Sequence, residues 1–447
     1  MRFETTYKLE KFILDTNWDD LPDEVKTRLK GCFLDLIGAM IIGSKSDQFE
    51  VGVRLAETIY GKGDIPIIGS NKTFGFMGAS CALGHSSNAY DIDDGHNIIR
   101  AHPGTSFVGA ILSAACEKDK SLQEFLTAML VAYETSIRSG AAIMDYYNYA
   151  HSSGTFGAIG VAAGVGKIYD FTKEQLNNVL SVAEFNAPLV PGIRSVEYPS
   201  MNKDGVPFGV MIGTLAVMET LCGFEGNKNL LEADEYKYYL DDLGIKYQIM
   251  DLYFKPYTCC RWAHPAIDAC ISLLEKHNIS YKDIQKVNIH TFHRATLLSK
   301  IIPQTVDEAQ YNIAYPVAAS LIYKDFGFMQ VRKENLQDQK VIDMMGKLSF
   351  ITDLELDSKF PEHRICKAEI ITLDGRTFVS EECEPRGEAN ENIGYEWLCD
   401  KFRRITSPLF TSEGQEVIIN LLEKCENLSV REIVNEINKQ KYWKNIN

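Results

Sequence analysis

Residues 79–102 read ASCALGHSSNAYDIDDGHNIIRAH, a run of small and apolar residues that leads into a dense group of ionisable ones. The ionisable side chains are Asp91, Asp93, Asp94, His85, His96, His102 and Arg100. So many titratable groups behind an apolar run are typical of a functional site. The alternative is the end of a helix followed by a solvated acidic loop. Other polar clusters lie in similar apolar, glycine-rich context further along the chain, and we expect them to converge with this one.

The segments around this stretch predict helices. Apolar residues between Val25 and Gly43 recur three and four positions apart, as they do on the buried face of a helix. Capping boxes mark further helix starts at Ser121, Thr172 and Ser429. Residues 104–115 and 154–166 are rich in Gly and Ala, which lets neighbouring helices pack closely. We therefore expect core helices in both segments.

The pattern changes near Leu252. Val287, Ile289 and Thr291 alternate with polar residues, as in a half-buried strand. Asp374-Gly375 separates two strand-like runs, which is a strong hairpin signal. Helical patterns at residues 265–276 and 314–323 lie between these strands. The sequence thus predicts a mainly α protein with a helical domain at residues 1–251, a smaller α+β domain at 252–390 and a helical return at 391–447 that packs on the first part.

Composition and charge restrict the functional classes. The 447 residues carry a formal net charge of −15, which argues against nucleic acid or an anionic membrane surface as a partner. An anionic substrate would need a local cluster of cations. The 11 cysteines are scattered and odd in number, which favours buried thiols in a reducing cytoplasm. No run of 18 apolar residues occurs, and no spacing typical of a zinc site is present. We expect a cytoplasmic protein with no metal and no cofactor.

Two motifs in the first half carry candidate binding groups. The stretch HSSGTFG at residues 151–157 places His151 with Ser152 and Ser153 at a glycine-rich helix start, where hydroxyls and main-chain amides suit a carboxylate. A helix cap with an incidental histidine is the alternative. Lys203 lies in YPSMNKDGVP at residues 198–207, ahead of a small-residue helix, and a solvated lysine is the alternative there.

Two further motifs lie in the second half. KPYTCCRWAHP at residues 255–265 groups Lys255, Cys260, Arg261 and His264 where the pattern changes, and clefts often form between domains. AQYNIAYP at residues 309–316 places two tyrosines at a helix start. A phenol from this motif is a candidate site group, although tyrosines in this position are usually part of the core.

Taken together, these motifs resemble the MmgE/PrpD family, which includes 2-methylcitrate dehydratase, cis-aconitate decarboxylase and iminodisuccinate epimerase. The landmarks are DIDD with the following His102-Pro103, HSSGTFG, the lysine before the small-residue helix, KPYTCCRWAHPAID, AQYNIAYPVA, and LDGRTF leading to PRG. The resemblance covers nearly the whole chain. It implies a large helical domain built from both chain ends, a smaller α+β lid domain, and a homodimer. It also implies a site formed by Asp91, His102, His151, Lys203, Lys255 and Tyr315.

The sequence departs from the decarboxylase pattern at three places. Gly95 stands where the decarboxylase has a threonine, and one extra residue lies between Asp94 and His102. Cys260 stands where the decarboxylase has a histidine thought to act on the substrate. The loss of that imidazole argues against cis-aconitate decarboxylation, whereas dehydratase-like members often carry a cysteine there.

These features lead us to expect a cofactor-independent lyase for a small di- or tricarboxylate. Dehydration of a 2-methylcitrate-like hydroxy acid, by proton abstraction alpha to a carboxylate, is the first choice. An iminodisuccinate-like epimerase and a cis-aconitate-type decarboxylase are the alternatives within the family. Outside the family, a class II terpene cyclase with an Asp-x-Asp-Asp motif, a metal hydrolase and a non-catalytic binding module remain open.

The expected roles follow from the chemistry. Lys203 and Lys255 would stabilise the growing negative charge, and Asp91 would remove the proton. Histidines titrate nearest neutral pH and suit proton delivery to a departing hydroxide, while a tyrosine would hold an oxygen. These roles fall to His102, His151 and Tyr315. The expected substrate-binding residues are Arg100, Ser152, Ser153, Cys260, Arg261 and His264.

Overall fold

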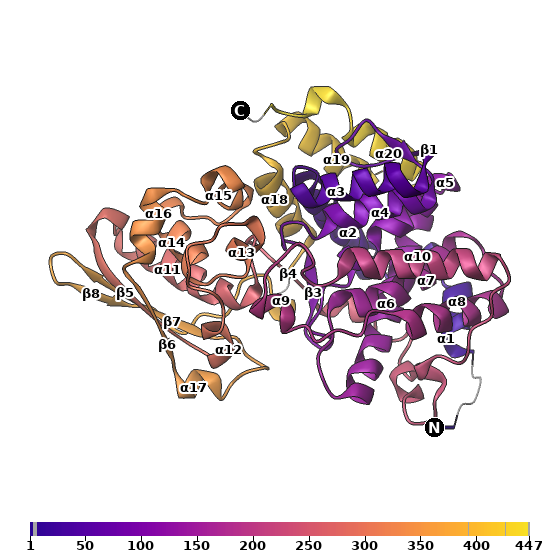
Figure 1. Cartoon of the computed structure of the whole chain (residues 1–447), viewed down its shortest axis with the longest axis horizontal. Helices are drawn as coiled ribbons and strands as arrows, with labels where there is room; N and C mark the ends of the chain where they lie inside the picture. The colour runs from indigo at the N-terminus through magenta and orange to yellow at the C-terminus, as the bar shows by residue number, and fades with distance from the viewer. Residues whose placement is uncertain (3–6, 392, 425, 446–447) are drawn as a thin grey trace.

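The computed structural model describes residues 1–2, 7–391, 393–424 and 426–445, and it is mainly α-helical, as the sequence predicted. The larger part of the molecule is a helical body that includes both ends of the chain (Figure 1). Its N-terminal helices are α1 (Lys8–Asp15), α2 (Asp23–Gly43), α3 (Asp47–Leu55), α4 (Phe76–Ser87), α5 (Val108–Glu117), α6 (Leu122–Tyr147), α7 (Ser153–Ile168), α8 (Lys173–Asn186), α9 (Arg194–Glu197) and α10 (Val206–Leu221). A small hairpin, β1 (Lys62–Pro66) and β2 (Thr73–Phe74), lies between α3 and α4.

The centre of the helical body is α7, which packs against α6, α8 and α10. Small residues allow these helices to approach closely. A Cβ atom on Gly154 would lie 2.2 Å from the main-chain oxygen of Gly205, and one on Gly209 would lie 2.3 Å from that of Gly154. Any larger residue at either position would push α10 away from α7. The core helices expected from the Gly/Ala-rich segments are confirmed.

The C-terminal helices return to the N-terminal ones, as expected. They are α18 (Tyr395–Thr406), α19 (Ser412–Lys424) and α20 (Val430–Ile437). Both α18 and α19 pack on α2, and α20 packs on α5 and β1 (Figure 1). The three capping boxes read from the sequence are present at the starts of α6, α8 and α20.

Most of the intervening chain forms an α+β unit around one four-stranded sheet (Figure 1). The strands are β5 (Ile284–Thr291), β6 (Leu348–Thr352), β7 (Cys366–Thr372) and β8 (Thr377–Val379), in the order β6-β5-β7-β8. β5 and β6 are parallel, whereas the other pairs are antiparallel, and β7 and β8 form the predicted hairpin. The helices of this unit are α11 (His264–His277), α12 (His293–Thr296), α13 (Val306–Gln310), α14 (Ala314–Tyr323), α15 (Phe328–Val331), α16 (Gln339–Met345) and α17 (Leu354–Asp357). The domain boundaries at 252 and 390 stay predictions.

A short strand pair joins the two parts. β3 (Asp94–His96) continues from the acidic run, and β4 (Leu252–Phe254) pairs with it antiparallel, so that Gly95 lies opposite Tyr253. This register places the residue after β4, Lys255, beside the acidic run. Among the described residues, none of the helices is both long and apolar enough to cross a bilayer.

A buried ion pair fastens the C-terminal return to this region. Lys401 of α18 lies 2.6 Å from Asp35 Oδ1 of α2, and its ammonium also donates to the main-chain oxygen of Ile92 at 2.6 Å. Burial raises the pKa of Asp35 to about 6, although Lys401 opposes the shift. Removing one partner of such a pair leaves the other charge buried and uncompensated, which is costly.

We therefore expect Lys401→Met to lower the free energy of unfolding by about 3 kcal/mol, because both Asp35 and the Ile92 carbonyl lose their donor. Denaturant titration followed by circular dichroism measures this. Lys441→Met is the control, because Lys441 forms an ion pair with Glu413 on the surface and its loss should leave stability unchanged. Equal free energies of unfolding for the two variants would show that the buried pair does not stabilise the fold.

Candidate active site

The acidic run forms a buried loop between α4 and β3, at residues 88–94 (loop 88–94). Asp91, Asp93 and Asp94 are each at most 1% exposed. Asp91 has a positive φ of 51°, which turns the chain sharply at this point. The interpretation as a solvated acidic loop is therefore wrong.

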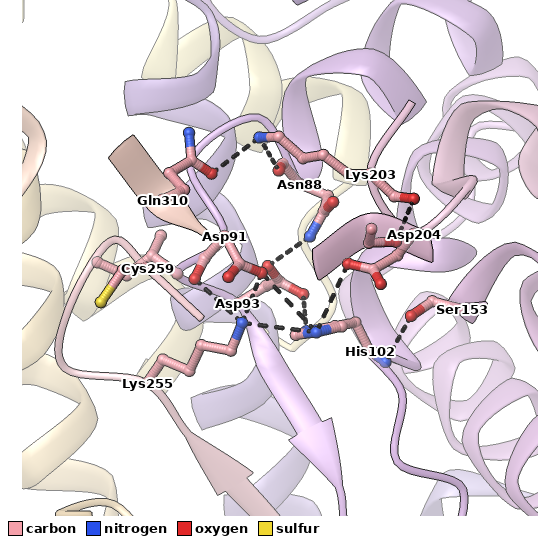
Figure 2. Close-up of polar contacts among 12 residues, drawn as sticks. Asn88, Asp91, Asp93, His102, Ser153, Lys203, Asp204, Lys255, Cys259 and Gln310 are labelled. Atoms are coloured by element: carbon pink, nitrogen blue, oxygen red, sulfur yellow. Dashed lines mark hydrogen bonds and ion pairs between the residues drawn. The ribbon is translucent and has the colours of Figure 1, made fainter. Parts of the chain in front are cut away.

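Lysines from three distant segments donate to the main-chain oxygens of loop 88–94. Lys203 donates to Asn88 at 3.1 Å and also to Ala89, and Lys255 donates to Asp91 at 3.1 Å. Lys401 donates to Ile92, as described above. Figure 2 shows Lys203 and Lys255 approaching the loop from opposite sides. The loop is thus held by charge-assisted hydrogen bonds in place of regular secondary structure.

His102 lies at the centre of a group of carboxylates (Figure 2). Its Nδ1 atom is 3.0 Å from Asp93 Oδ2, and its Nε2 atom is 3.8 Å from both Asp91 Oδ1 and Asp204 Oδ2. Burial and the nearby Lys255 ammonium lower the pKa of His102, yet the surrounding carboxylates outweigh both effects and raise it to about 10. His102 is therefore an imidazolium at neutral pH.

Asp91 and Lys255 form a second buried pair beside this imidazolium. The Lys255 ammonium is 2.6 Å from Asp91 Oδ1 and 3.5 Å from His102 Nε2. Burial lowers the pKa of Lys255, but the carboxylates of Asp91 and Asp93 raise it above its usual range, so the ammonium stays charged.

A cavity of about 450 Å³ opens beside these groups and is lined by both the helical body and the α+β unit. The predicted residues that line it are Asp91, Arg100, His102, His151, Lys255, Cys260 and Arg261. Its size is ordinary for a small-ligand site. Cationic side chains around the aspartates favour an anionic substrate over the hydrocarbon substrate of a terpene cyclase.

His151 is the member of this set with an unsatisfied polar side chain. It is 1% exposed, and both of its ring nitrogens lack a hydrogen-bond partner among the described residues. Its ring packs against Tyr149, with a centroid distance of 4.0 Å. Burial lowers the pKa of His151 to about 4, so the imidazole is neutral and offers one donor and one acceptor to a ligand.

Lys203 and Tyr315 do not line the cavity. The Lys203 ammonium is bound by loop 88–94, by Gln310 Oε1 at 2.9 Å and by Asp307 at 3.4 Å. The Tyr315 hydroxyl donates to the main-chain oxygens of Gln330 and Asn335, at 3.0 and 3.1 Å.

Ser152, Ser153 and His264 also lie outside the lining. Ser152 is the N-cap residue of α7, and Ser153 Oγ accepts the main-chain N–H of His102 at 3.0 Å. His264 Nε2 is 3.0 Å from the main-chain oxygen of Cys259. Ser153 thus supports His102, which reaches the cavity, and His264 supports the residue before Cys260, which also reaches it.

Sequence reasoning missed two residues that complete the acid–base group. Asp204 lines the cavity next to His102, and the Tyr311 hydroxyl donates to Asp204 Oδ2 at 3.0 Å. Burial, opposed by His102, raises the pKa of Asp204. Both residues stand beside groups that the sequence did single out, since Asp204 follows Lys203 and Tyr311 precedes Tyr315 by four residues. Arg294 and Arg364 also line the cavity, and no local pattern points to them.

One set of side chains in the cavity has the composition of a metal site. Ligand atoms of Asp91, His102 and Asp204 lie within 4.8 Å of one another. The Lys255 ammonium already binds Asp91 there, and a protonated His102 is not a ligand, so the residues present do not fit a divalent cation. The alternative set with His96 is not assembled either, since His96 does not line the cavity. A metal-free site stays a prediction.

Comparison with known proteins identifies the family of the chain. The MmgE/PrpD N-terminal domain matches residues 7–240, and the MmgE/PrpD C-terminal domain matches residues 257–427. The chain therefore belongs to the MmgE/PrpD family.

Two relatives align over almost the whole chain. The chain is 24% identical over 465 residues to a cis-aconitate decarboxylase-like protein of Aspergillus oryzae, an alignment that covers 94% of each protein. It is 21% identical over 456 residues to cis-aconitate decarboxylase of Homo sapiens, covering 91% of this chain and 89% of the relative. These relatives are named as enzymes, which supports an enzyme here.

The charge state of His102 is testable without a substrate. Because Asp93 is its closest carboxylate, Asp93→Asn should lower the pKa of His102 by more than about one unit, toward or below 6.5. The ion pair in the unaltered protein stabilises the fold fully below pH 6.5 and loses this contribution as the pH rises through about 10. NMR titration of labelled histidines, with His102→Gln for assignment, measures the change.

Asp94→Asn is the matched control for this titration. The Asp94 carboxyl accepts from Tyr133 and from the main-chain N–H of Gly104, and burial raises its pKa to about 7. Its side chain does not face His102, so the histidine should titrate as in the unaltered protein. A His102 that titrates near pH 6.5 in all three proteins would contradict the assigned pair.

Proposed function

We propose that the protein is a lyase that moves a proton at a carbon alpha to a carboxylate in a small di- or tricarboxylic acid. The observation that supports this most is the convergence of an imidazolium, two carboxylates and an ammonium on one cavity. His102, Asp91, Asp204 and Lys255 supply these groups. The reaction needs a proton acceptor, a proton donor and a cation at the developing enolate.

Asp204 is the better candidate for the base. The Asp91 carboxylate is bound by Lys255, whereas Asp204 has a raised pKa and a hydrogen bond from Tyr311 that orients it. A carboxylate with a raised pKa is a stronger base at neutral pH. In this scheme Asp91 holds the ammonium in place, and the base role shifts from Asp91 to Asp204.

His102 suits the role of the acid. It carries its proton at neutral pH, and its Nε2 atom faces Asp91 and Asp204. Its Nδ1 atom lies 3.1 Å from the main-chain oxygen of Asp94 and 3.0 Å from Asp93 Oδ2. In a dehydration, Asp204 takes the alpha proton, the C–O bond breaks as the double bond forms, and the departing hydroxide leaves as water with the His102 proton. Lys255 stabilises the enolate oxygen, because its ammonium lies 3.5 Å from His102 Nε2 and so next to the reacting carbon in this scheme.

Dehydration of a 2-methylcitrate-like hydroxy acid is the first candidate reaction. The second is decarboxylation, the reaction in the names of the two relatives. In that reaction a C–C bond breaks, CO₂ leaves, and a proton donor must reach the carbanion. Cys260 lines the cavity at the position where the resemblance expects an imidazole, and burial raises the pKa of this thiol to about 12. A neutral thiol is a poor proton donor beside His102, which favours dehydration.

Incubation with citrate, 2-methylcitrate, cis-aconitate and iminodisuccinate in D₂O, followed by proton NMR, tests the proposal. Dehydration gives an alkene signal, decarboxylation the loss of one carboxyl group, and epimerisation deuterium uptake without elimination. Dehydration or decarboxylation of any of these acids supports the proposal, and a His102→Gln sample serves as the blank. Epimerisation alone, or no conversion of the whole panel by the folded protein, would overturn it.

On the acid that is converted, Asp204→Asn should lower kcat by at least about 10²-fold, the scale of a lost general base. The amide keeps the shape of the carboxylate and can still accept the Tyr311 hydrogen bond. Asp251→Asn, which removes a surface partner of Lys246, is the control and should retain full turnover. Normal turnover by Asp204→Asn would return the base role to Asp91.

The two tyrosines of AQYNIAYP should differ in the same assay. Tyr311→Phe removes the hydrogen bond to Asp204 and should lower kcat by about tenfold or more. Tyr315→Phe removes only hydrogen bonds to main-chain oxygens away from the cavity and should lower the melting temperature while kcat is retained. A larger loss of kcat in Tyr315→Phe would assign the phenol role to Tyr315, as the resemblance implies.

A further inference from the structure

Three arginines besides Arg261 line the same cavity. Arg100 lies in the turn after β3, Arg294 lies on α12, and Arg364 precedes β7. Within the part of the chain that the structure describes, none of the three guanidinium groups takes part in a hydrogen bond or an ion pair. They come from both sides of the cavity, one from the helical body and two from the α+β unit.

The other cations of the cavity are already balanced. Lys255 is paired with Asp91, His102 with Asp93, and Arg261 with Glu388. Arg261 is further fixed by Asn97 Oδ1 at 2.8 Å. The three unpaired arginines therefore leave an excess of positive charge that the side chains of the cavity do not neutralise, because Asp204 already faces His102.

Arg364 is the least exposed of the three, at 8%. Its guanidinium lies 5.9 Å from the centre of the Phe360 ring, which in turn stacks on Phe292 at 5.0 Å. Burial lowers the pKa of Arg364 and the nearby charge of Arg100 adds to the effect, whereas Tyr253, Cys260 and Glu384 oppose it without reversing it. A buried, unpaired charge held beside a like charge is unfavourable unless an anion binds between them.

We propose that Arg100, Arg294 and Arg364 form a carboxylate-binding subsite that makes a tricarboxylate the preferred substrate. This inference rests on the proposed function, because it assigns the reacting end of the substrate to Lys255 and His102. In this proposal, the substrate carboxylate next to the reacting carbon binds near Lys255. A guanidinium binds a carboxylate with two parallel hydrogen bonds, so three of them offer more donors than one carboxylate uses. The subsite thus fits two further carboxylates of one small molecule.

Kinetics of Arg364→Gln test the subsite. With the tricarboxylate that the enzyme converts, KM should rise by about tenfold or more while kcat changes little, because the lost contact is remote from the reacting carbon. With a substrate analogue that lacks one carboxylate, the same variant should show a much smaller change in KM.

Arg100→Gln, from the opposite side of the cavity, should change KM in the same way, and Arg376→Gln on the β7–β8 turn is the control that should leave KM unchanged. An unchanged ratio of the two KM values in both cavity variants would overturn the subsite and leave the proposed function intact.

A binding measurement separates the subsite from the reaction. Propane-1,2,3-tricarboxylate has no hydroxyl to eliminate, so it reports binding alone. It should raise the melting temperature of the unaltered protein more than glutarate does, and Arg364→Gln should abolish the difference. Without ligand, Arg364→Gln should melt no lower than the unaltered protein, because it removes an unpaired buried charge. Selective stabilisation in a protein that converts no acid would support the subsite while the proposed function fails, and equal effects of the two acids on the unaltered protein would contradict the subsite.

Discussion

The structure depends on the main-chain oxygens of loop 88–94, which are buried without a sheet or helix to bind them. Three lysine ammonium groups donate to these oxygens, and they come from the segment before α10, from the residue after β4 and from α18. Each ammonium also has a carboxylate partner, Asp307, Asp91 or Asp35. A buried carbonyl needs a donor and a buried ammonium needs an anion, so each contact satisfies two requirements at once. The helical body, the α+β unit and the C-terminal return are thereby fixed around one loop.

This arrangement also sets the protonation states of the cavity. Because loop 88–94 turns at Asp91, its neighbouring carboxylates point in different directions: Asp93 faces His102, while Asp94 is held by Tyr133 and Gly104. Burial raises the pKa of Asp93, but His102 and Lys255 outweigh it and lower that pKa to about 2, whereas burial raises the pKa of Asp94 to about 7. Two adjacent aspartates thus differ in charge at neutral pH, because Asp93 is ionised and Asp94 is near the midpoint of its titration. The first keeps an imidazolium at the cavity, and the second adds only part of a charge to the loop.

Local features were predictable from the sequence, and the walls of the cavity were not. Helices such as α2 and α14, and the β7–β8 hairpin, follow from spacing and turn residues within a short segment. Asp91, His102 and Lys255 follow from dense polar motifs. Tyr311 and Tyr315, by contrast, share one motif, and only the direction of each side chain in the folded chain separates them. Arg364 lies in a segment with no motif, because its role arises from the place of its side chain in a cavity that distant segments line together.

The strand pair β3–β4 shows how one departure from the family pattern can be compensated. A Cβ atom on Gly95 would lie 2.2 Å from the Tyr253 hydroxyl, so the threonine that the resemblance places here in the decarboxylase has no space in this chain. Tyr253 occupies that space, lines the cavity, and carries the Arg261 guanidinium 3.6 Å above its ring. The stacked arginine is paired with Glu388, which fixes it as part of the wall. A large aromatic–cation pair therefore forms the wall of the cavity next to the acid–base group in this chain, at the place where the resemblance puts a small hydroxyl in the decarboxylase. The His102–Asp93 pair itself lies outside this part of the wall.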